Sequence, residues 1–212
     1  MRMRAPFIKI FFIIAAITVL DPVAVSSEDT NASEFFRIGV QNSQKMEYSE
    51  AIDAFQHAIK LNPKHSEAYY NLGHAYFKLH RYEESLQSYK KAAAIKPKYV
   101  DALIATGIVA SMLSRYDEAV EALKKAVKVK PNHAEAHNNL GNIYSEMGNH
   151  EQAMKSYEKA VKLKPDFAEA RFHLGMSYME YRKQLLSSAR KEYKALRKLN
   201  KDLAEELNSV IK

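Results

Sequence analysis

The chain has 212 residues and no cysteine. The absence of cysteine excludes disulfide bonds, thiolate metal ligands and cysteine nucleophiles. Glycine and proline are also scarce, with six of each, and none of the glycines forms a phosphate-cradling loop or a nucleophile elbow. Because no other catalytic signature is present, the sequence predicts a protein that is not an enzyme and that uses no cofactor.

The N-terminal segment, residues 1–26, differs from the rest of the chain. Three basic residues precede an apolar run from Ile10 to Leu20, and small residues follow. This order is typical of a secretory signal peptide. The apolar run is shorter than the roughly 20 residues that span a bilayer, but an uncleaved N-terminal membrane anchor remains the alternative. Either one predicts an exported body: periplasmic, secreted or membrane-anchored outside the cytoplasm.

The scarce residues reveal a repeat. Four of the six prolines and five of the six glycines recur at one constant interval along the chain. These residues are Pro63, Pro97, Pro131, Pro165, Gly39, Gly73, Gly107, Gly141 and Gly175. The interval predicts units over residues 32–65, 66–99, 100–133, 134–167 and 168–201, preceded by a linker over 27–31 and followed by residues 202–212.

Each unit has the pattern of two amphipathic helices. Apolar or small residues recur at positions 4, 7, 8 and 11, and again at 20, 24 and 27, which are spacings that place side chains on one helix face. Small residues at positions 8, 20 and 27 let helix axes approach closely, while larger ones fill the remaining space. The proline at position 32 stops the second helix.

The runs NLGHAYFKLHRYEESLQSYKKAAAIKP and NLGNIYSEMGNHEQAMKSYEKAVKLKP resemble tetratricopeptide repeats, abbreviated TPR. The resemblance extends over residues 32–201 and implies an all-α fold. That fold is a right-handed α-α superhelix, a TPR solenoid of about five helix-turn-helix repeats with a C-terminal capping helix.

The fifth unit departs most from the pattern. The interval from Gly175 to the corresponding alanine, Ala189, is two residues longer than the interval from Gly141 to Ala153. This difference predicts a degenerate repeat with a longer turn around Arg182–Leu186. Residues 202–212 are predicted to form the capping helix, which begins at a capping box of Asp202 and Glu205 and covers the end of the stack.

The resemblance also implies a binding groove. In TPR proteins the first helix of each repeat lines the concave surface at positions 2, 5, 6, 9, 12 and 13. The predicted groove residues are Phe36, Tyr70, Asn71, His74, Phe77, Ile104, Ile108, Asn138, Asn139, Asn142, Phe172 and Met176. Amides can pair with a peptide backbone, and aromatic residues and methionine offer adaptable contact area. Several of these side chains could instead pack between helices.

The predicted partner is a protein or peptide segment, held either extended or as an amphipathic helix. Some TPR proteins clamp a C-terminal carboxylate, but of the matching positions here only Asn71 fits that mode. Self-association, with membrane attachment through the N-terminus, is the alternative function.

Neither nucleic acid nor a metal is expected. The formal net charge is +7, but the lysines of the second helices alternate with glutamates, as on a solvated face. His133 and His137 could supply half of a zinc site. His65, however, occupies the same position in its unit as His133, which favours a packing role for the pair.

Overall fold

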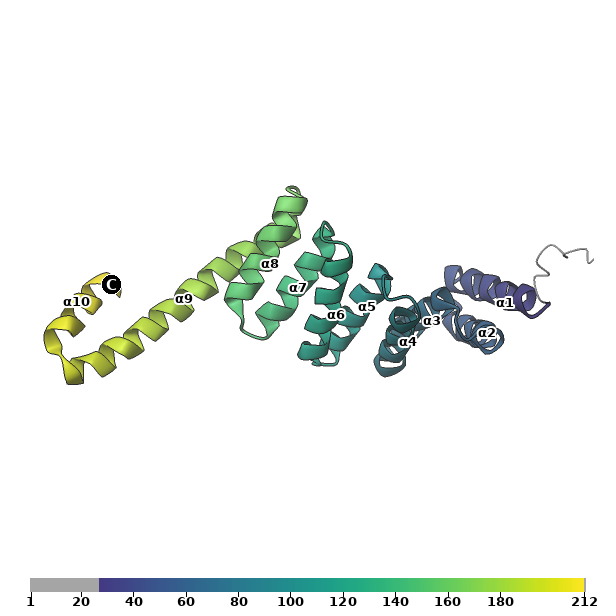
Figure 1. Ribbon diagram of the computed structural model, residues 1–212, viewed down its shortest axis with the longest axis horizontal. Coiled ribbons are helices and arrows are strands. Elements are labelled where there is room, and N and C mark those ends of the chain that lie inside the picture. The colour runs from purple at the N-terminus through teal and green to yellow at the C-terminus, as the bar shows by residue number, and fades with distance from the viewer. Residues whose placement is uncertain (1–26, 212) are drawn as a thin grey trace, which may run out of the picture.

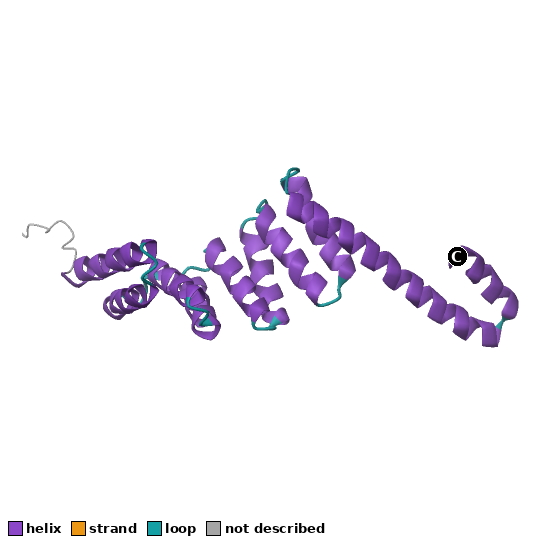
Figure 2. Ribbon diagram, turned by 180° about the vertical axis from the view of Figure 1, so that it is seen from behind, coloured by secondary structure: helices purple, strands orange, loops and turns teal. Residues whose placement is uncertain are grey.

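The computed structural model describes residues 27–211, and within them all regular structure is α-helical (Figures 1 and 2). Eight helices form four consecutive antiparallel pairs that stack side by side. Their bounds are α1 Ser27–Gln44 and α2 Tyr48–Leu61, α3 Ser66–Lys78 and α4 Tyr82–Ile95, α5 Val100–Met112 and α6 Tyr116–Val129, and α7 Ala134–Glu146 and α8 His150–Leu163. Two more helices follow, α9 Ala168–Leu199 and α10 Lys201–Ile211.

The N-terminal predictions meet different outcomes. The predicted targeting segment, residues 1–26, lies outside the described residues. The predicted linker over residues 27–31 is wrong, because α1 already begins at Ser27. Among residues 27–211, no helix combines the length and apolar character needed to cross a membrane.

Within each pair, the glycine at position 8 allows the two helices to approach closely. A Cβ atom added to Gly141 would lie 2.6 Å from the ring of Tyr157, and one added to Gly39 would lie 2.5 Å from the ring of Phe55. Phe55 and Tyr157 are almost completely buried. The first helix therefore has no room for a side chain at this position, because the second helix fills it.

The turn inside each pair uses a residue in the left-handed region. Met46, His80, Ser114 and Gly148, at position 15 of their units, have φ values of 65, 59, 58 and 72°. After α3, the N–H of His80 donates to the carbonyl of Phe77 and the N–H of Arg81 donates to the carbonyl of Tyr76. This is a Schellman motif, which ends the first helix and satisfies its last carbonyls.

The fifth unit does not form a helix-turn-helix repeat, so that prediction is wrong. α9 is one continuous helix of 32 residues, and Arg182, which is one repeat interval after Gly148, lies inside it. The physical reason is local: between Gly175 and Leu199 the chain has no glycine or proline to end a helix, and it is rich in strong helix formers. The first half of α9 packs on α8, and the second half projects from the stack (Figure 1).

The C-terminal helix is also placed differently from the prediction. α10 folds back against α9 rather than covering the end of the four pairs (Figure 1). Its first turn is capped by Asn200, whose Oδ1 accepts from the N–H of Leu203 at 3.1 Å, and not by Asp202. Ala204 is completely buried, whereas Leu203 is half exposed.

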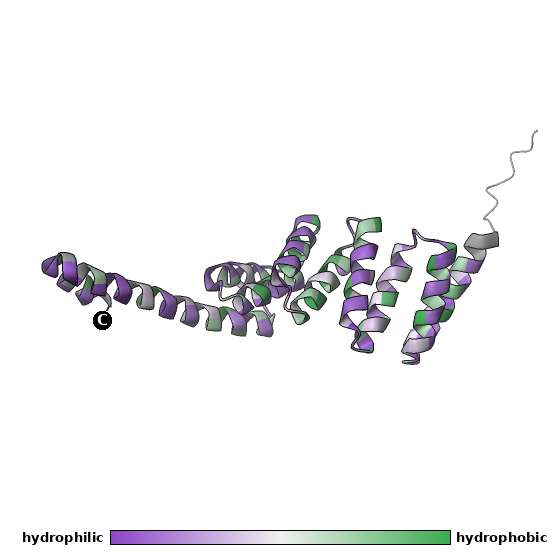
Figure 3. Ribbon diagram, turned by 90° about the horizontal axis from the view of Figure 1, so that it is seen from below, coloured by the Kyte–Doolittle hydropathy of each residue, from purple (hydrophilic) through white to green (hydrophobic). Residues whose placement is uncertain are grey.

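Charge is distributed unevenly along the fold. Residues 27–181 contain twenty basic and twenty acidic residues, whereas residues 182–201 contain eight basic residues and one acidic residue. The projecting half of α9 is correspondingly hydrophilic over much of its length (Figure 3). The stack itself is therefore balanced in charge, and the segment over residues 182–201 is strongly basic.

Candidate peptide-binding surface

The first helices α1, α3, α5, α7 and the start of α9 form one continuous side of the stack, called here the first-helix surface. It contains the repeat positions 2, 5, 6, 9, 12 and 13. The predicted groove residues all lie on these five helices, but the structure gives them different roles.

Two of the aromatic residues at position 5, Phe36 and Tyr70, are largely engaged within the fold. The ring of Phe36 lies 4.6 Å from that of His65 and 5.9 Å from that of Phe55, between centroids. The ring centroid of Tyr70 lies 5.4 Å from that of Tyr89 and 5.1 Å from that of Tyr99. Burial raises the pKa of Tyr99 to about 12, with the neighbouring Tyr70 adding to the effect. These rings therefore stabilise the junction between a helix pair and the loop that follows it.

Phe77 and Ile104 have similar structural roles. The ring of Phe77 lies 5.8 Å from that of Tyr82, and Ile104 packs against the central core around Leu123. Both side chains are only partly buried, so each also contributes some surface on the side of the first helices.

Three of the asparagines already have partners. The Nδ2 of Asn71 donates to the carbonyl of Glu67 at 2.8 Å, and the Oδ1 of Asn142 accepts from the hydroxyl of Tyr157 at 2.7 Å. Asn138 is 2% exposed, and its Nδ2 donates to Glu169 at 3.0 Å. Asn138 therefore joins α7 to α9 and is out of reach of a partner, which corrects the groove prediction at this residue. Its Oδ1 is buried without a hydrogen-bond partner.

The accessible part of the surface lies on α3, α5 and α7. Ile108 is 37% exposed, and His74 and Asn139 are partly buried. Burial, and then the charge of Lys78, lower the pKa of His74. Met112 is 48% exposed and lies one helical turn after Ile108, so it belongs to the same face. The prediction missed Met112, although position 13 of the repeat would have identified it.

Phe172 and Met176 lie on α9 and are 65% and 44% exposed. Met179, one turn further, is 67% exposed. Their exposure has a different origin from that of Ile108, because no second helix of the repeat packs on this face of the first half of α9.

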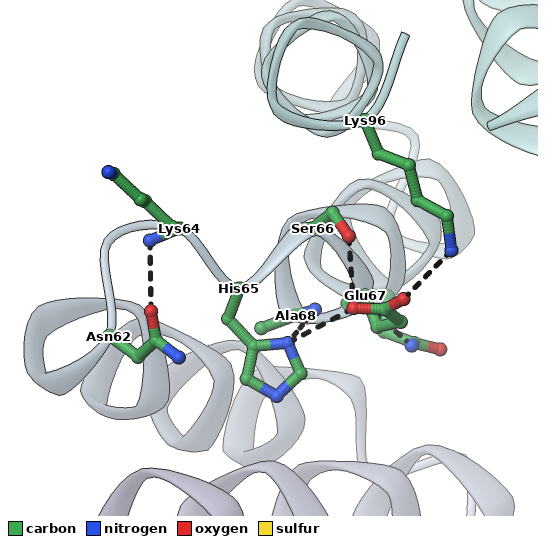
Figure 4. Close-up of polar contacts among 8 residues, drawn as sticks. Asn62, Lys64, His65, Ser66, Glu67, Ala68 and Lys96 are labelled. Carbon is green, nitrogen blue, oxygen red and sulfur yellow. Dashed lines mark hydrogen bonds and ion pairs between the residues drawn. The ribbon is translucent and has the colours of Figure 1, made fainter. Parts of the chain in front are cut away.

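The loops beside the first-helix surface contain a polar arrangement that occurs twice, and Figure 4 shows its first copy. The Nδ1 of His65 accepts from the N–H of Ala68 at 3.3 Å, which caps α3. Glu67 accepts from Ser66 at 2.9 Å and pairs with Lys96 at 3.3 Å. Burial raises the pKa of Glu67, but bonds from its own backbone N–H, Ser66 and Lys96 outweigh it, so the pKa is lowered overall.

The second copy of this arrangement contains His133, one of the two candidate zinc ligands in the sequence. The Nδ1 of His133 accepts from the N–H of Ala136 at 3.4 Å, and Glu135 lies 3.6 Å from Lys164. His137 instead contacts the carbonyl of Pro131 at 3.0 Å through Nε2. The two histidines thus have separate structural partners. Throughout residues 27–211, no group of three or more His, Asp or Glu side chains is placed to hold a metal ion.

Two surface hollows lie outside the accessible part of the first-helix surface. One, of about 440 Å³, lies between α4, α5 and α6, and its charges are paired as Lys90 with Glu118 and Lys125 with Glu121. The other, of about 880 Å³, follows α9 from Met179 to Lys194 and is rich in basic side chains. The first hollow offers no unpaired charge for a ligand among the residues named.

The comparisons with known proteins agree with the repeat. Models of the tetratricopeptide repeat match residues 66–99 and 134–167, and models of the TPR repeat match residues 44–80 and 113–148. None of the curated proteins compared with the chain matches it.

Solved structures of similar fold include MamA and YrrB. A crystal structure of the MamA protein is 26% identical, with a TM-score of 0.69, over 82% of this chain and 94% of that one. YrrB, described as a TPR protein with an unusual peptide-binding site, is 21% identical, with a TM-score of 0.63, over 88% of this chain and 100% of that one. The first TPR of Spaghetti (RPAP3), bound to the HSP90 peptide SRMEEVD, is 24% identical, with a TM-score of 0.54, over 56% of this chain and 94% of that one.

The last two likenesses, below 25% identity, bear on the fold alone. The family models cover about half of the chain, and the four stacked helix pairs have the architecture that those models describe. The chain therefore belongs to the tetratricopeptide repeat family and has the scaffold of a protein-interaction module.

Proposed function

We propose that this protein is an exported, non-catalytic scaffold that holds an extended segment of a partner protein on the first-helix surface of α3, α5 and α7, and so assists a multiprotein assembly. The observation that carries the proposal is the exposed apolar pair Ile108 and Met112 on the central helix. Amide and imidazole groups lie on the flanking helices α3 and α7, with Asn71 and Asn139 at position 6 of their units and His74 at position 9, the position of Ile108. Apolar contacts beside groups that pair with a backbone suit an extended peptide.

The chemistry of Asn71 fits this role. Its bond to the carbonyl of Glu67 uses one donor hydrogen, which leaves one donor and the carbonyl oxygen of the amide for a ligand. YrrB and the first TPR of RPAP3, which share the fold, are described with a peptide-binding site and with a bound peptide. These likenesses support a peptide as the class of ligand.

An internal segment fits better than a chain terminus. Val40, Asp101 and Ala105 occupy positions where a carboxylate clamp would need basic or amide groups. A peptide with a free C-terminal carboxylate should therefore bind no better than the same peptide with an amidated end.

The test uses the full chain to select binders from a library of extended peptides, followed by binding measurements in solution. Ile108→Glu places a charge in the centre of the surface and should weaken binding at least tenfold. The matched control is Val129→Glu, since Val129 lies on a second helix, α6, with a similar exposure of 38% against 37% for Ile108. Equal loss in both variants, or binding that Ile108→Glu leaves intact, would refute the proposed surface.

Export is proposed from the order of residues 1–26 alone. Expression of the full chain with N-terminal sequencing of the product should give a start near Ser27 if the segment is cleaved. Retention of the intact N-terminus in a membrane fraction would indicate the anchor, and a soluble product with an intact N-terminus would contradict export.

A further inference from the structure

One face of α9 lacks the partner that the same face has in every complete repeat. In the complete pairs, the glycine at position 8 lies against the second helix, and aromatic residues at positions 5 and 12 also pack there, as Phe36 does on Phe55 and Phe77 on Tyr82. A Cβ added to Gly175 would meet nothing within 4 Å. Phe172, at position 5 of the last unit, is 65% exposed. The face of Phe172, Gly175 and Met179 thus has the composition of a helix-packing face, but no second helix covers it.

The chain contains the missing helix in the far half of α9. In the fourth unit, the glycine is followed by Ala153, Tyr157 and Leu163. In the last unit, Gly175 is followed by Ala189, Tyr193 and Leu199, each two residues later than the repeat interval predicts. The constant offset preserves the spacing of the contact positions. Residues 186–199 therefore have the register of a second helix, and Tyr193 corresponds to the residue that covers the glycine.

The far half of α9 cannot reach this face within its own chain. An α-helix rises about 1.5 Å per residue, so Gly175 and Tyr193 are separated by roughly 27 Å along the axis. A second copy can supply the contact. If two α9 helices lie antiparallel with Gly175 against the other copy's Tyr193, then Met179 lies against the other copy's Ala189, and the symmetry axis passes near Gln184.

We propose that two copies of this chain form a symmetric dimer in which residues 186–199 of each copy occupy the face of Phe172, Gly175 and Met179 on the other. The interface continues the helix-pair packing already present four times in the stack, with Tyr193 over Gly175 as Tyr157 lies over Gly141. It is isologous, because each copy gives and receives the same segment. α10 packs on the far half of α9 and moves with it. The proposal is independent of peptide binding on α3, α5 and α7.

The distribution of charge is compatible with this arrangement. Residues 182–201 contain eight basic residues and one acidic residue, while residues 27–181 are balanced. Antiparallel packing places each basic segment against the balanced part of the other copy, and only Arg182 and Lys183 lie close to their counterparts near the axis. Salt should therefore strengthen the dimer modestly, because it screens that repulsion.

Cross-linking tests the pairing directly, since the chain has no cysteine of its own. Full chains with Met179→Cys and with Ala189→Cys are mixed and treated with a short bis-maleimide. The expected result is a covalent dimer from the mixture and none from either variant alone. An internal cross-link between the two cysteines of one chain, in a variant that carries both, would show that α9 folds back on itself and would overturn the proposal. The absence of any cross-link would overturn it as well.

A glycine substitution gives a second, independent readout. Gly175→Ala adds a Cβ that the single chain accommodates but that would strike the other copy's Tyr193, so sedimentation should show dimerisation weakened at least tenfold. At dilute concentration its thermal transition should stay unchanged or rise slightly, because alanine is a better helix former than glycine, whereas Gly141→Ala should lower that transition, since its Cβ would lie 2.6 Å from Tyr157. An undisturbed dimer of Gly175→Ala, or a lower transition of its monomer, would contradict the interface. Ile108→Glu should leave the dimer intact, which separates this test from that of peptide binding.

Discussion

Protonation of His74 makes the stability of the folded chain depend on pH. The side chain lies on α3 and is partly buried. Burial is the larger cause that lowers its pKa, and the charge of Lys78 is the smaller one. The folded chain therefore binds this proton less readily than the unfolded chain does, so protonation favours unfolding.

The first prediction concerns the pH dependence of stability. Above the ordinary histidine pKa of 6.5, His74 is neutral in both states and its full contribution is present. As the pH falls below that value toward the lowered pKa of the folded state, the free energy of unfolding should decrease. Urea unfolding at pH 7.5, 6.5 and 5.5 should show a smaller decrease for His74→Gln than for the unchanged chain.

The control for this prediction is His80→Asn, at an exposed histidine in the turn after α3. Asparagine tolerates the left-handed backbone that His80 adopts, with φ of 59°. This variant should keep the decrease of the unchanged chain. If it removes the pH dependence as fully as His74→Gln does, the dependence does not originate from burial of His74.

The adjacent amides of Asn138 and Asn139 show that the repeat interval does not determine whether a groove residue is accessible. Asn138 and Asn139 are adjacent, and both match groove positions. Asn138 is buried, because Glu169 of the next helix reaches it at 3.0 Å, and this contact depends on how α9 packs against α7. The repeat period places a residue on a face of its helix. Whether a partner can reach that residue depends on side chains from other units, which the period does not specify.

At the level of helices, one property separates α9 from the complete pairs. The four turns each contain a residue with positive φ at position 15, three of which are not glycine. Arg182 occupies that position of the last unit and is helical. The repeat interval correctly predicted the four pairs, because glycine lies where the paired helices approach closely and proline follows the end of each second helix. It could not predict the continuity of α9, because an intact apolar pattern is compatible with either a turn or a straight helix.

The start of α10 provides the second prediction. Asn200 accepts from the N–H of Leu203, so Asn200→Ala should destabilise α10 by about 1 kcal/mol, the usual cost of losing such a cap. Hydrogen exchange of the α10 amides should become faster, with little change elsewhere. Asp202→Ala, which removes only a charge in the first turn, should have a smaller effect. A larger effect of Asp202→Ala would restore Asp202 as the cap, as the sequence pattern indicates.

The whole molecule has two parts that depend on each other weakly. In a repeat stack each unit contacts only its neighbours, so stability is nearly a sum of unit and interface contributions. The core around Leu123, which is completely buried, lies in the middle of the stack. α10 packs on α9 and is not in substantial contact with the helix pairs. Loss of the far end should therefore leave the central core unchanged.

The third prediction follows from that separation. Deletion of residues 192–212 removes α10 and the end of α9, and at low protein concentration it should change the free energy of unfolding of the four pairs by less than about 0.5 kcal/mol. Leu123→Ala should cost about 2–5 kcal/mol, since it leaves a cavity in the core. Circular dichroism during thermal unfolding measures both.

A longer deletion, of residues 168–212, is the matched comparison. It removes the part of α9 that packs on α8, including His173, whose ring stacks on Tyr157 at 5.5 Å, and Tyr178, whose hydroxyl donates to Glu158 at 2.6 Å. This deletion exposes the apolar side of α8 and should lower the thermal transition clearly. If the short deletion lowers it equally, the far half of α9 stabilises the stack within a single chain. In that case the far half of α9 would be held by its own chain and would not be free to pack on a second copy.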